Sequence, residues 1–337
     1  MGIAAQRGNV LRAKGWRQEG LLRLLENVLE NGEDPENLIV YGALGKAARD
    51  WPSYHAIVDS LLNLEEDESL IVQSGKPIAV LKTHRDAPVV IMANSNLVGQ
   101  WARPDYFYEL YDKNLIAWGG LTAGDWQYIG SQGVIQGTYE IFQSIARQAF
   151  GGSLQGRFIL SAGMGGMGGS QPLAGKLTGA AILVVDVNEE NIDKRLELGY
   201  VDKKTDDLDQ ALGWIEEARQ EGTAFSVALV GNAATVYPDI LDRGIVPDIV
   251  TDQTAAHDLL YGYVPEGFSL DQVAQLRVSQ PQKLEEAAGK SIAKEVSAIL
   301  SFQAKGAQVF DNGNNIRTQA KRFGVENAFD IPVFTEA

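Results

Sequence analysis

The strongest constraint on the fold is a glycine-rich segment that follows an apolar run without a break. The run Arg157–Ala162 predicts a buried strand, the segment Gly163–Gly169 follows it, and a helix is expected over Gln171–Gly179. The G-x-G-x-x-G spacing within the segment is made by Gly163, Gly165 and Gly168. Between a strand and a helix, such glycines permit a tight turn, a close approach of backbone to pyrophosphate, and close packing of helix on strand. The helix that follows offers free N–H groups and the positive end of its dipole to phosphates.

An acidic residue stands at the matching position on the next predicted strand. That strand, Ala181–Val187, contains Asp186 near its end, 23 residues after Gly163 (186 − 163). An acid about 20 residues after the glycine motif hydrogen-bonds the ribose 2′-OH of a dinucleotide and disfavours a 2′-phosphate. Loop and acid together predict dinucleotide binding, with NAD preferred over NADP. The alternative is a glycine turn with a purely structural role.

Strand and helix patterns alternate after Thr138. Helices are expected at Tyr139–Phe150, Asp207–Gln220, Leu270–Leu276 and Gln280–Lys305, and strands at Ser226–Val230 and Asp248–Thr251. This alternation is typical of a parallel sheet with covering helices. We therefore predict an α/β protein whose residues 138–305 form a Rossmann-type domain.

The first 137 residues have a less regular pattern and are predicted to form an N-terminal α+β core domain. Helices are expected at Leu21–Leu29, Lys46–Asp50 and Tyr54–Leu64, and strands at Asn37–Tyr41, Ser69–Gln73, Ile78–Lys82 and Val89–Ala93, the last of them buried. The stretch Asn94–Gly137 lacks clear periodicity, and long stretches of this kind in compact domains are usually functional. The basic arm before residue 24 could be a solvated terminus or could reach across a dimer.

The composition excludes several classes of function. A net charge of -15 argues against nucleic acid or an anionic membrane as the main partner. The absence of cysteine excludes disulfides, thiolate metal sites and a cysteine nucleophile, and three scattered histidines make a metal site unexpected. Neither a signal peptide nor an apolar run of roughly 18 residues is present, so we expect a cytoplasmic protein without a membrane segment.

Two histidines and an asparagine are candidates for a role near the cofactor. His257 follows the strand Asp248–Thr251, and Asn232-Ala233 follows another strand, at the sheet edge where ligands of parallel sheets bind. His84 lies just after a strand of the N-terminal domain. Either histidine could be a general acid or base or a structural residue, and Asn232 could contact the nicotinamide ribose or form a turn.

Several segments resemble those of the urocanase (urocanate hydratase) family. They are GGLTAGDWQYIGSQGVIQGTYE, LSAGMGGMGGSQPLAG, LVGNAA, DIVTDQTAAHD and GNNIR, and the resemblance runs from RGNVLRAKGW to NAFDIP. It implies a lyase that adds water to urocanate, giving imidazolone propionate, with tightly bound NAD as the electrophile and no net redox change. It also implies a homodimer, and a Rossmann domain inserted into a discontinuous core to which residues 306–337 return.

The resemblance also implies the site residues by position. Tyr41 and His84 fall beside the substrate. The implied NAD contacts are Gly42, Ala43, Gly166, Met167, Gly168, Asp186, Asn232, Ala233, Gln253, Thr254, Ala255, Ala256, His257, Tyr263 and Val264.

Four positions depart from the family pattern. Gly120 replaces the usual glutamine, Asn191 an arginine, Asn312 a tyrosine, and Asp186 is shorter than the usual glutamate. These departures suggest a divergent member that acts on a modified urocanate, such as a sulfur-substituted one.

Two other functions remain open at this stage. One is an NAD-dependent dehydrogenase, which would consume free NAD. The other is a catalytically incomplete NAD-binding module. Family members continue well beyond Ala337 with residues for the substrate carboxylate and for proton transfer, so we expect that this chain could bind NAD without turnover on its own.

Overall fold

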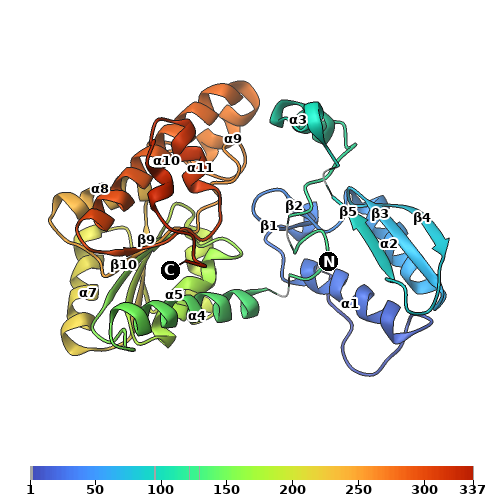
Figure 1. Ribbon diagram of the computed structural model, residues 1–337, viewed down its shortest axis with the longest axis horizontal. Coiled ribbons are helices and arrows are strands. Elements are labelled where there is room, and N and C mark those ends of the chain that lie inside the picture. Colours follow the sequence, from blue (N-terminus) through green and yellow to red (C-terminus); the bar gives the residue numbers. More distant parts are fainter. Residues whose placement is uncertain (1–2, 95, 121, 129, 337) are drawn as a thin grey trace. The chain divides into compact units, whose positions relative to one another are not determined.

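The computed structural model describes residues 3–94, 96–120, 122–128 and 130–336. Among these residues the contacts form two compact units, Met1–Gly130 and Ser131–Ala337, which are described separately (Figure 1). The predicted boundary at residue 137 lies inside a helix, α4 (Ser131–Ala149), which begins eight residues earlier than expected (139 − 131).

The first unit combines helices with two small sheets. Its elements are α1 (Trp16–Glu30), η1 (Pro35–Asn37), β1 (Ile39–Tyr41), β2 (Gly45–Lys46), α2 (Trp51–Asn63), β3 (Glu68–Gln73), β4 (Lys76–Lys82), β5 (Val90–Ala93), η2 (Gly99–Trp101) and α3 (Pro104–Asp112). The strand order is β4-β3-β5, with β4 antiparallel and β5 parallel to β3, and β1 pairs separately with β2. This mixture confirms the predicted α+β character.

Three predictions for the first unit were wrong in detail. Lys46–Asp50 is not a helix, because the side chain of Asp50 accepts a hydrogen bond from Ser53 N (2.8 Å) and caps the start of α2. The strand at Val90–Ala93 is not buried, since its residues are half-buried or exposed and Ile91 is 46% exposed. The aperiodic stretch after residue 94 contains the helix α3, which begins at Pro104, a residue suited to the first turn.

The basic arm folds back on α1. Arg12 pairs with Glu19 (3.0 Å) and with Glu26 (2.6 Å), and Arg7 pairs with Glu30 (2.6 Å). These ion pairs hold the arm against one side of α1.

The second unit alternates strands and helices. Its elements after α4 are β6 (Phe158–Ala162), η3 (Gly168–Ser170), α5 (Gln171–Leu177), β7 (Ala181–Asp186), α6 (Glu189–Glu197), β8 (Lys203–Thr205), α7 (Leu208–Glu221), β9 (Phe225–Val230), α8 (Ala233–Asp242), β10 (Ile249–Val250), α9 (Leu270–Ser279), α10 (Pro281–Ala304), β11 (Gln308–Val309), α11 (Ile316–Arg322) and η4 (Ala328–Asp330). Within residues 131–336 the six strands pair in parallel in the order β11-β10-β6-β7-β9-β8. The predicted Rossmann-type sheet is confirmed.

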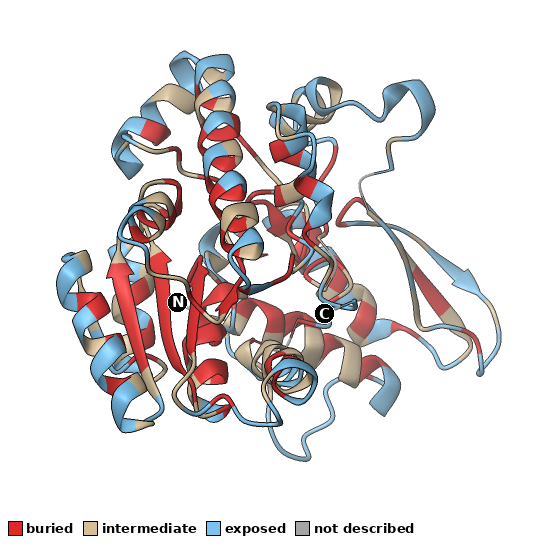
Figure 2. Cartoon of the chain, turned by 60° about the vertical axis from the view of Figure 1, so that its left-hand side comes forward, coloured by how far each residue is buried: buried red, intermediate tan, exposed pale blue. Residues whose placement is uncertain are grey.

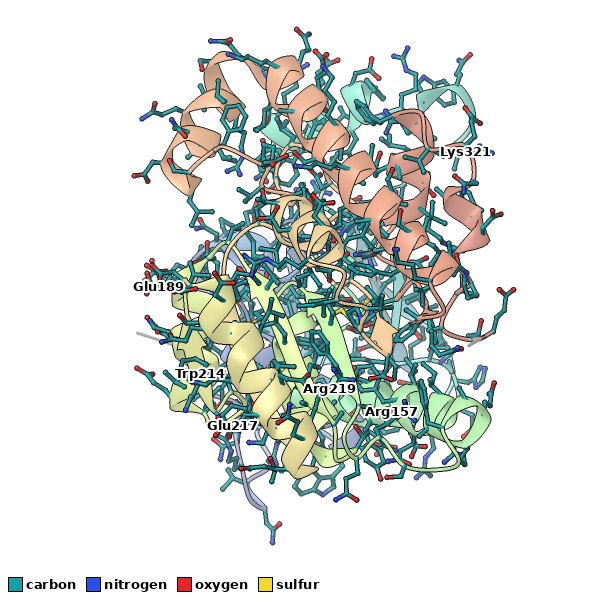
Figure 3. All side chains as sticks on the ribbon, turned by 90° about the vertical axis from the view of Figure 1, so that its left-hand side faces the viewer. Arg157, Glu189, Trp214, Glu217, Arg219 and Lys321 are labelled. Atoms are coloured by element: carbon teal, nitrogen blue, oxygen red, sulfur yellow. The ribbon has the colours of Figure 1, made fainter. Side chains whose placement is uncertain are left out.

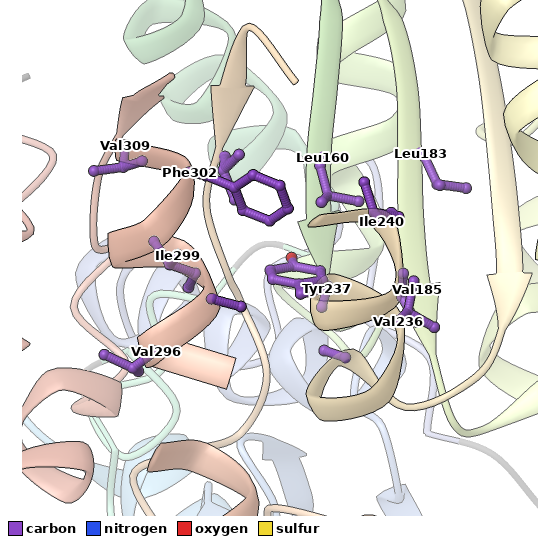
Figure 4. Close-up of a cluster of buried hydrophobic side chains, with 14 of the residues drawn as sticks. Leu160, Leu183, Val185, Val236, Tyr237, Ile240, Val296, Ile299, Phe302 and Val309 are labelled. Carbon is purple, nitrogen blue, oxygen red and sulfur yellow. The ribbon is translucent and has the colours of Figure 1, made fainter. Parts of the chain in front are cut away.

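Helices cover both faces of this sheet, and its inner strands β6, β7, β9 and β10 are almost entirely buried (Figure 2). Successive strand residues point to opposite faces, so Leu160 joins the core under α7, α8 and α10, whereas Ile159 joins the core under α4 and α5. Figure 4 shows the first of these cores, where Tyr237 of α8 lies near Phe302 of α10, with ring centroids 6.4 Å apart.

The C-terminal segment belongs to the second unit. β11 pairs with β10 through Ile249–Gln308 and Val250–Val309, and the following Phe310 is buried. The structure therefore places residues 306–336 at the edge of the Rossmann-type sheet, where the sequence analysis expected a return to the N-terminal domain. α6 and β8 were not predicted, because they are short and mostly polar.

Ion pairs join neighbouring elements at the amino-terminal end of the sheet. Arg157 lies just before β6 and Arg219 comes from α7, and both pair with Asp248 (2.8 and 3.7 Å; Figure 3). These ion pairs give the amino-terminal end of the sheet a structural role, so the carboxyl ends of the strands are the place to look for a ligand site.

Within the described part of the chain, no helix has the length and apolarity needed to cross a membrane.

Candidate nucleotide-binding site

The order of the strands marks the position of a candidate ligand site at their carboxyl ends. The chain leaves β6 toward β7 on one side, whereas it leaves β10 toward β11 on the other, so the direction reverses between β6 and β10. In open parallel sheets, ligands bind at this reversal point. The loops that follow β6 and β10 meet there, since Gln253 N donates to Ala162 O (2.8 Å).

The glycine loop lacks side chains at the two positions where neighbouring backbone comes closest. Gly163 has φ +85°, and a Cβ on it would lie 2.5 Å from the carbonyl of Gln253. A Cβ on Gly168 would collide with the carbonyl group of Gly163. These backbone contacts leave little freedom to shift, so both positions require glycine, and the loop packs closely on the backbone at Gln253.

The side chain of Gln171, the first residue of α5, supports the loop from inside. Its Nε2 donates to Ala162 O (3.3 Å) and Gly163 O (3.2 Å), and its Oε1 accepts from Ser161 Oγ (2.6 Å). A buried side-chain amide of this kind stabilises the loop conformation, because moving the loop would leave buried polar groups without hydrogen bonds, at a cost in free energy. No local sequence pattern indicated Gln171, because its role depends on where the loop carbonyls point.

Asp186 is the last residue of β7, as predicted for the acid. It accepts hydrogen bonds from Asn188 N (2.7 Å), from Met164 N in the glycine loop, and from the side chain of Asn191. Burial raises the pKa of Asp186, while these hydrogen bonds and the charge of Arg195 act in the opposite direction. The carboxylate thus joins β7 to the phosphate loop, and Asn191, one of the departures from the family pattern, contacts it.

Arg195 on α6 is a further loop contact that the sequence did not reveal. Its Nη2 donates to Gly165 O (2.7 Å), and a Cβ on Gly169 would collide with its guanidinium group. Gly169, outside the G-x-G-x-x-G spacing, therefore makes room for Arg195. A single arginine in a polar helix carried no signal for this role.

The residues after β9 and those before α9 are brought together by Asn232. Its Oδ1 caps α8 by accepting from Ala234 N (3.0 Å), and its Nδ2 donates to Val264 O (2.9 Å). Two stretches that the resemblance assigned to the cofactor, Asn232-Ala233 and Tyr263-Val264, are therefore neighbours in space.

The loop after β10, Gln253–His257, is held by residues that follow β11. Asn312 Nδ2 donates to Thr251 Oγ1 (2.9 Å) and Asp252 O (3.0 Å), and Asn314 Nδ2 donates to Thr254 O (2.9 Å). Asn312, another departure from the family pattern, thus acts on the backbone that leads into this loop. His257 lies half-buried at the far end of the same loop.

In the first unit, Tyr41 and the residues around it form a second candidate set. The Tyr41 hydroxyl accepts from Thr122 N (3.0 Å), and its ring lies 4.9 Å from that of Tyr128. A Cβ on Gly120 would lie 3.7 Å from the same hydroxyl, in ordinary contact. Gly42 and Ala43 follow in a left-handed turn, with φ +69° and +66°.

His84 lies apart from these residues within the first unit. It is exposed on the turn between β4 and β5, whereas Tyr41 ends β1, which pairs with β2 in a separate sheet. Its assignment beside the substrate remains a prediction. Across the described ranges, no cluster of three or more His, Asp or Glu side chains could hold a metal ion.

A parallel sheet with a glycine loop after one strand and an acid at the end of its neighbour defines a Rossmann-like domain, the class that binds nucleotide cofactors. The family model for the urocanase Rossmann-like domain matches residues 130–337, and that for the urocanase N-terminal domain matches residues 3–127. The chain belongs to the urocanase family. The two matched ranges meet where the structure divides into its two units.

Proposed function

We propose that this chain binds NAD tightly and performs urocanase-type hydration, adding water to urocanate or a modified urocanate to give an imidazolone propionate. The observation that carries the proposal is the glycine loop joined to Asp186 at the strand reversal, in a chain whose two units both match urocanase domains. The cytoplasm and a homodimer are the setting we propose, as expected for this family.

The described residues at the carboxyl ends of β6, β7 and β10 fit NAD. Gly163 and Gly168 allow the tight, closely packed turn that dinucleotide-binding domains place beside the pyrophosphate, and Asp186 offers carboxylate oxygens to ribose hydroxyls. A negative charge there disfavours a 2′-phosphate, which supports NAD over NADP. Asn232, the loop Gln253–His257 and Tyr263-Val264 would hold the nicotinamide half. When bound, NAD supplies an electrophilic nicotinamide ring.

The surroundings of Tyr41 support a substrate larger than urocanate. The Tyr41 hydroxyl is oriented by Thr122 and is available to position a polar substrate group. A Cβ at Gly120 would meet no atom closer than 3.5 Å, but the φ of +64° disfavours a side chain, so glycine both suits the backbone and leaves a small space beside that hydroxyl. A substituent such as sulfur on the substrate would use this space.

The test is to purify the full chain, denature it and measure released nucleotide by mass spectrometry, followed by the loss of urocanate absorbance. We expect NAD in near one-to-one amount in the wild-type protein and little in Gly168→Ala. Gly213→Ala, on α7, is the matched control, because no described atom lies within 4 Å of the added Cβ.

Other outcomes separate the alternatives. Formation of NADH from added NAD would indicate a dehydrogenase. Retained NAD without loss of urocanate or of sulfur-substituted urocanate would indicate a binding module. A protein that neither retains nor binds NAD would overturn the proposal.

A further inference from the structure

A buried carboxyl pair lies beneath the loop that flanks the glycine loop. Glu295 on α10 is fully buried, and Asp252, two residues after β10, is 2% exposed. The two side chains are in hydrogen-bond contact, although both would be negatively charged at their ordinary pKa. Two buried carboxylates in contact cannot both ionise without a large cost, so such a pair shares one proton.

The hydrogen bonds around the pair show which member carries the proton. Asp252 already accepts from Thr254 N (3.1 Å), Thr254 Oγ1 (2.9 Å) and Asn314 Nδ2. Glu295 Oε2 accepts a hydrogen bond from the Tyr263 hydroxyl (2.7 Å). Among the described residues, no N–H or O–H group donates to Glu295 Oε1. A proton on Oε1, donated to Asp252, satisfies both groups.

The electrostatics of the surroundings agree with this assignment. Burial raises the pKa of Asp252 to about 6 and, together with the charge of Asp252, raises that of Glu295 well above its ordinary value. The titratable groups that face the pair are Tyr237 from α8 and Tyr263 from the segment before α9, and burial raises both of their pKa values. Both tyrosines therefore stay neutral. On the β11 side, Asp311 is paired with Arg317 (2.7 Å).

The pair is coupled to the candidate nucleotide site through Thr254. Thr254 donates to Asp252 through both its N–H and its hydroxyl, and its carbonyl accepts from Asn314, which also holds Asp252. The peptide between Gln253 and Thr254 is also the one against which Gly163 packs. A change in the charge of the pair therefore acts on the wall of the glycine loop.

We propose that Glu295 is a positioning residue whose proton, donated to Asp252, keeps Gln253–His257 in the conformation that flanks the glycine loop. When alkaline pH removes this proton to solvent, two adjacent negative charges loosen the loop and weaken nucleotide binding. The inference rests on the proposed function for the identity of the nucleotide as NAD, but not for the proton itself.

The experiment compares the full-length wild type with Glu295→Gln between about pH 6 and about pH 10. In Glu295→Gln the amide donates permanently to Asp252 and its carbonyl accepts from Tyr263. The dissociation constant for NAD should rise in the wild type by up to about tenfold per pH unit once the proton leaves, the limit for one linked proton, and should stay flat in Glu295→Gln. Glu286→Gln, the same change at an exposed position of α10, should follow the wild type.

Two measurements without nucleotide complete the test. Infrared spectra of the wild type at neutral pH should show a band of a buried protonated carboxyl that Glu295→Gln lacks. Hydrogen exchange at residues 253–257 should accelerate with pH more steeply in the wild type than in Glu295→Gln. If NAD does not bind at any pH while both signals appear, the proposed function fails and the positioning role stands.

If Glu295→Gln does not fold, the infrared spectra and the hydrogen exchange of the wild type still test whether Glu295 carries the proton. Absence of the carboxyl band at neutral pH, or equal pH slopes for the wild type and Glu295→Gln, would overturn the inference.

Discussion

In the structure, Gly163 and Gly168 have packing roles that differ from those the motif spacing predicted. The spacing predicted that the third glycine serves the packing of helix on strand. In the structure, the missing side chain of Gly168 instead makes room for the carbonyl of Gly163, and that of Gly163 makes room for the backbone at Gln253. Backbone therefore packs directly on backbone in this loop, and a methyl group at either position would collide with it.

At this scale the prediction concerns Gly168→Ala. We expect this change to destabilise the protein by roughly 1–3 kcal/mol, because the added methyl group must displace backbone, and to abolish nucleotide retention. Gly213→Ala should stabilise it by up to about 1 kcal/mol, since alanine favours an open helix position. Urea denaturation and nucleotide content measure both. Equal stabilities of the two variants would contradict the tight packing at Gly168.

At the scale of elements, α1 and the arm before it depend on one buried acid. Glu19 accepts from the backbone N–H groups of Arg12 (2.9 Å) and Ala13 (3.1 Å) and pairs with Arg23 (2.7 Å). α1 begins at Trp16, and its N-cap residue, Gly15, has no side chain to cap it. The contacts of Glu19 therefore help to fix the start of the helix. The basic arm is thus a structural part of the first unit.

The pH dependence of stability tests this network. Burial tends to raise the pKa of Glu19, but hydrogen bonds from Arg23, Arg12 and Ala13 outweigh burial and lower it from 4.5 to about 2. Because the folded state binds this proton less tightly than the unfolded chain, the contribution of Glu19 is fully present above about pH 4.5 and is lost as the pH falls toward 2.

Glu19→Gln should therefore cost on the order of 2 kcal/mol at neutral pH and should flatten the decline of Tm between about pH 5 and pH 2. Thermal unfolding monitored by circular dichroism measures this decline. Glu36→Gln, an exposed change in the same unit, is the control. A Glu19→Gln profile parallel to that of the wild type would show that Glu19 is not the titrating group.

At the scale of the whole molecule, each unit is compact in its own right. The second unit has a separate hydrophobic core on each face of its sheet, and both cores consist of residues after 131. A layered sheet buried on both faces is sufficient for independent folding. The proposed nucleotide contacts, apart from Gly42 and Ala43, also belong to this unit.

We therefore expect residues 131–337, produced as a separate chain, to unfold in one cooperative transition and to bind NAD. Calorimetry and a titration with NAD measure these properties. Weaker binding than in the full chain would indicate that Gly42 and Ala43 contribute. A noncooperative transition would contradict the independence of this unit.

The sequence by itself determined the features that are encoded by residues close together along the chain. The buried strand, the glycine spacing and the helix after it predicted the loop, and the next strand placed Asp186 at its end, as the structure confirms. Local patterns also led to a wrong prediction at Lys46–Asp50. There Asp50 caps the start of α2 and does not end a helix.

Only the tertiary structure decided which strands became neighbours. That order brought β11 beside β10, retained the C-terminal segment in the second unit, and placed Asn312 and Asn314 against the loop at Gln253–His257. It also brought Glu295 against Asp252, although 43 residues separate them in sequence (295 − 252). The physical reason is that strand order and helix packing are selected by burial over the whole sheet, whereas a spacing along the chain records only local geometry.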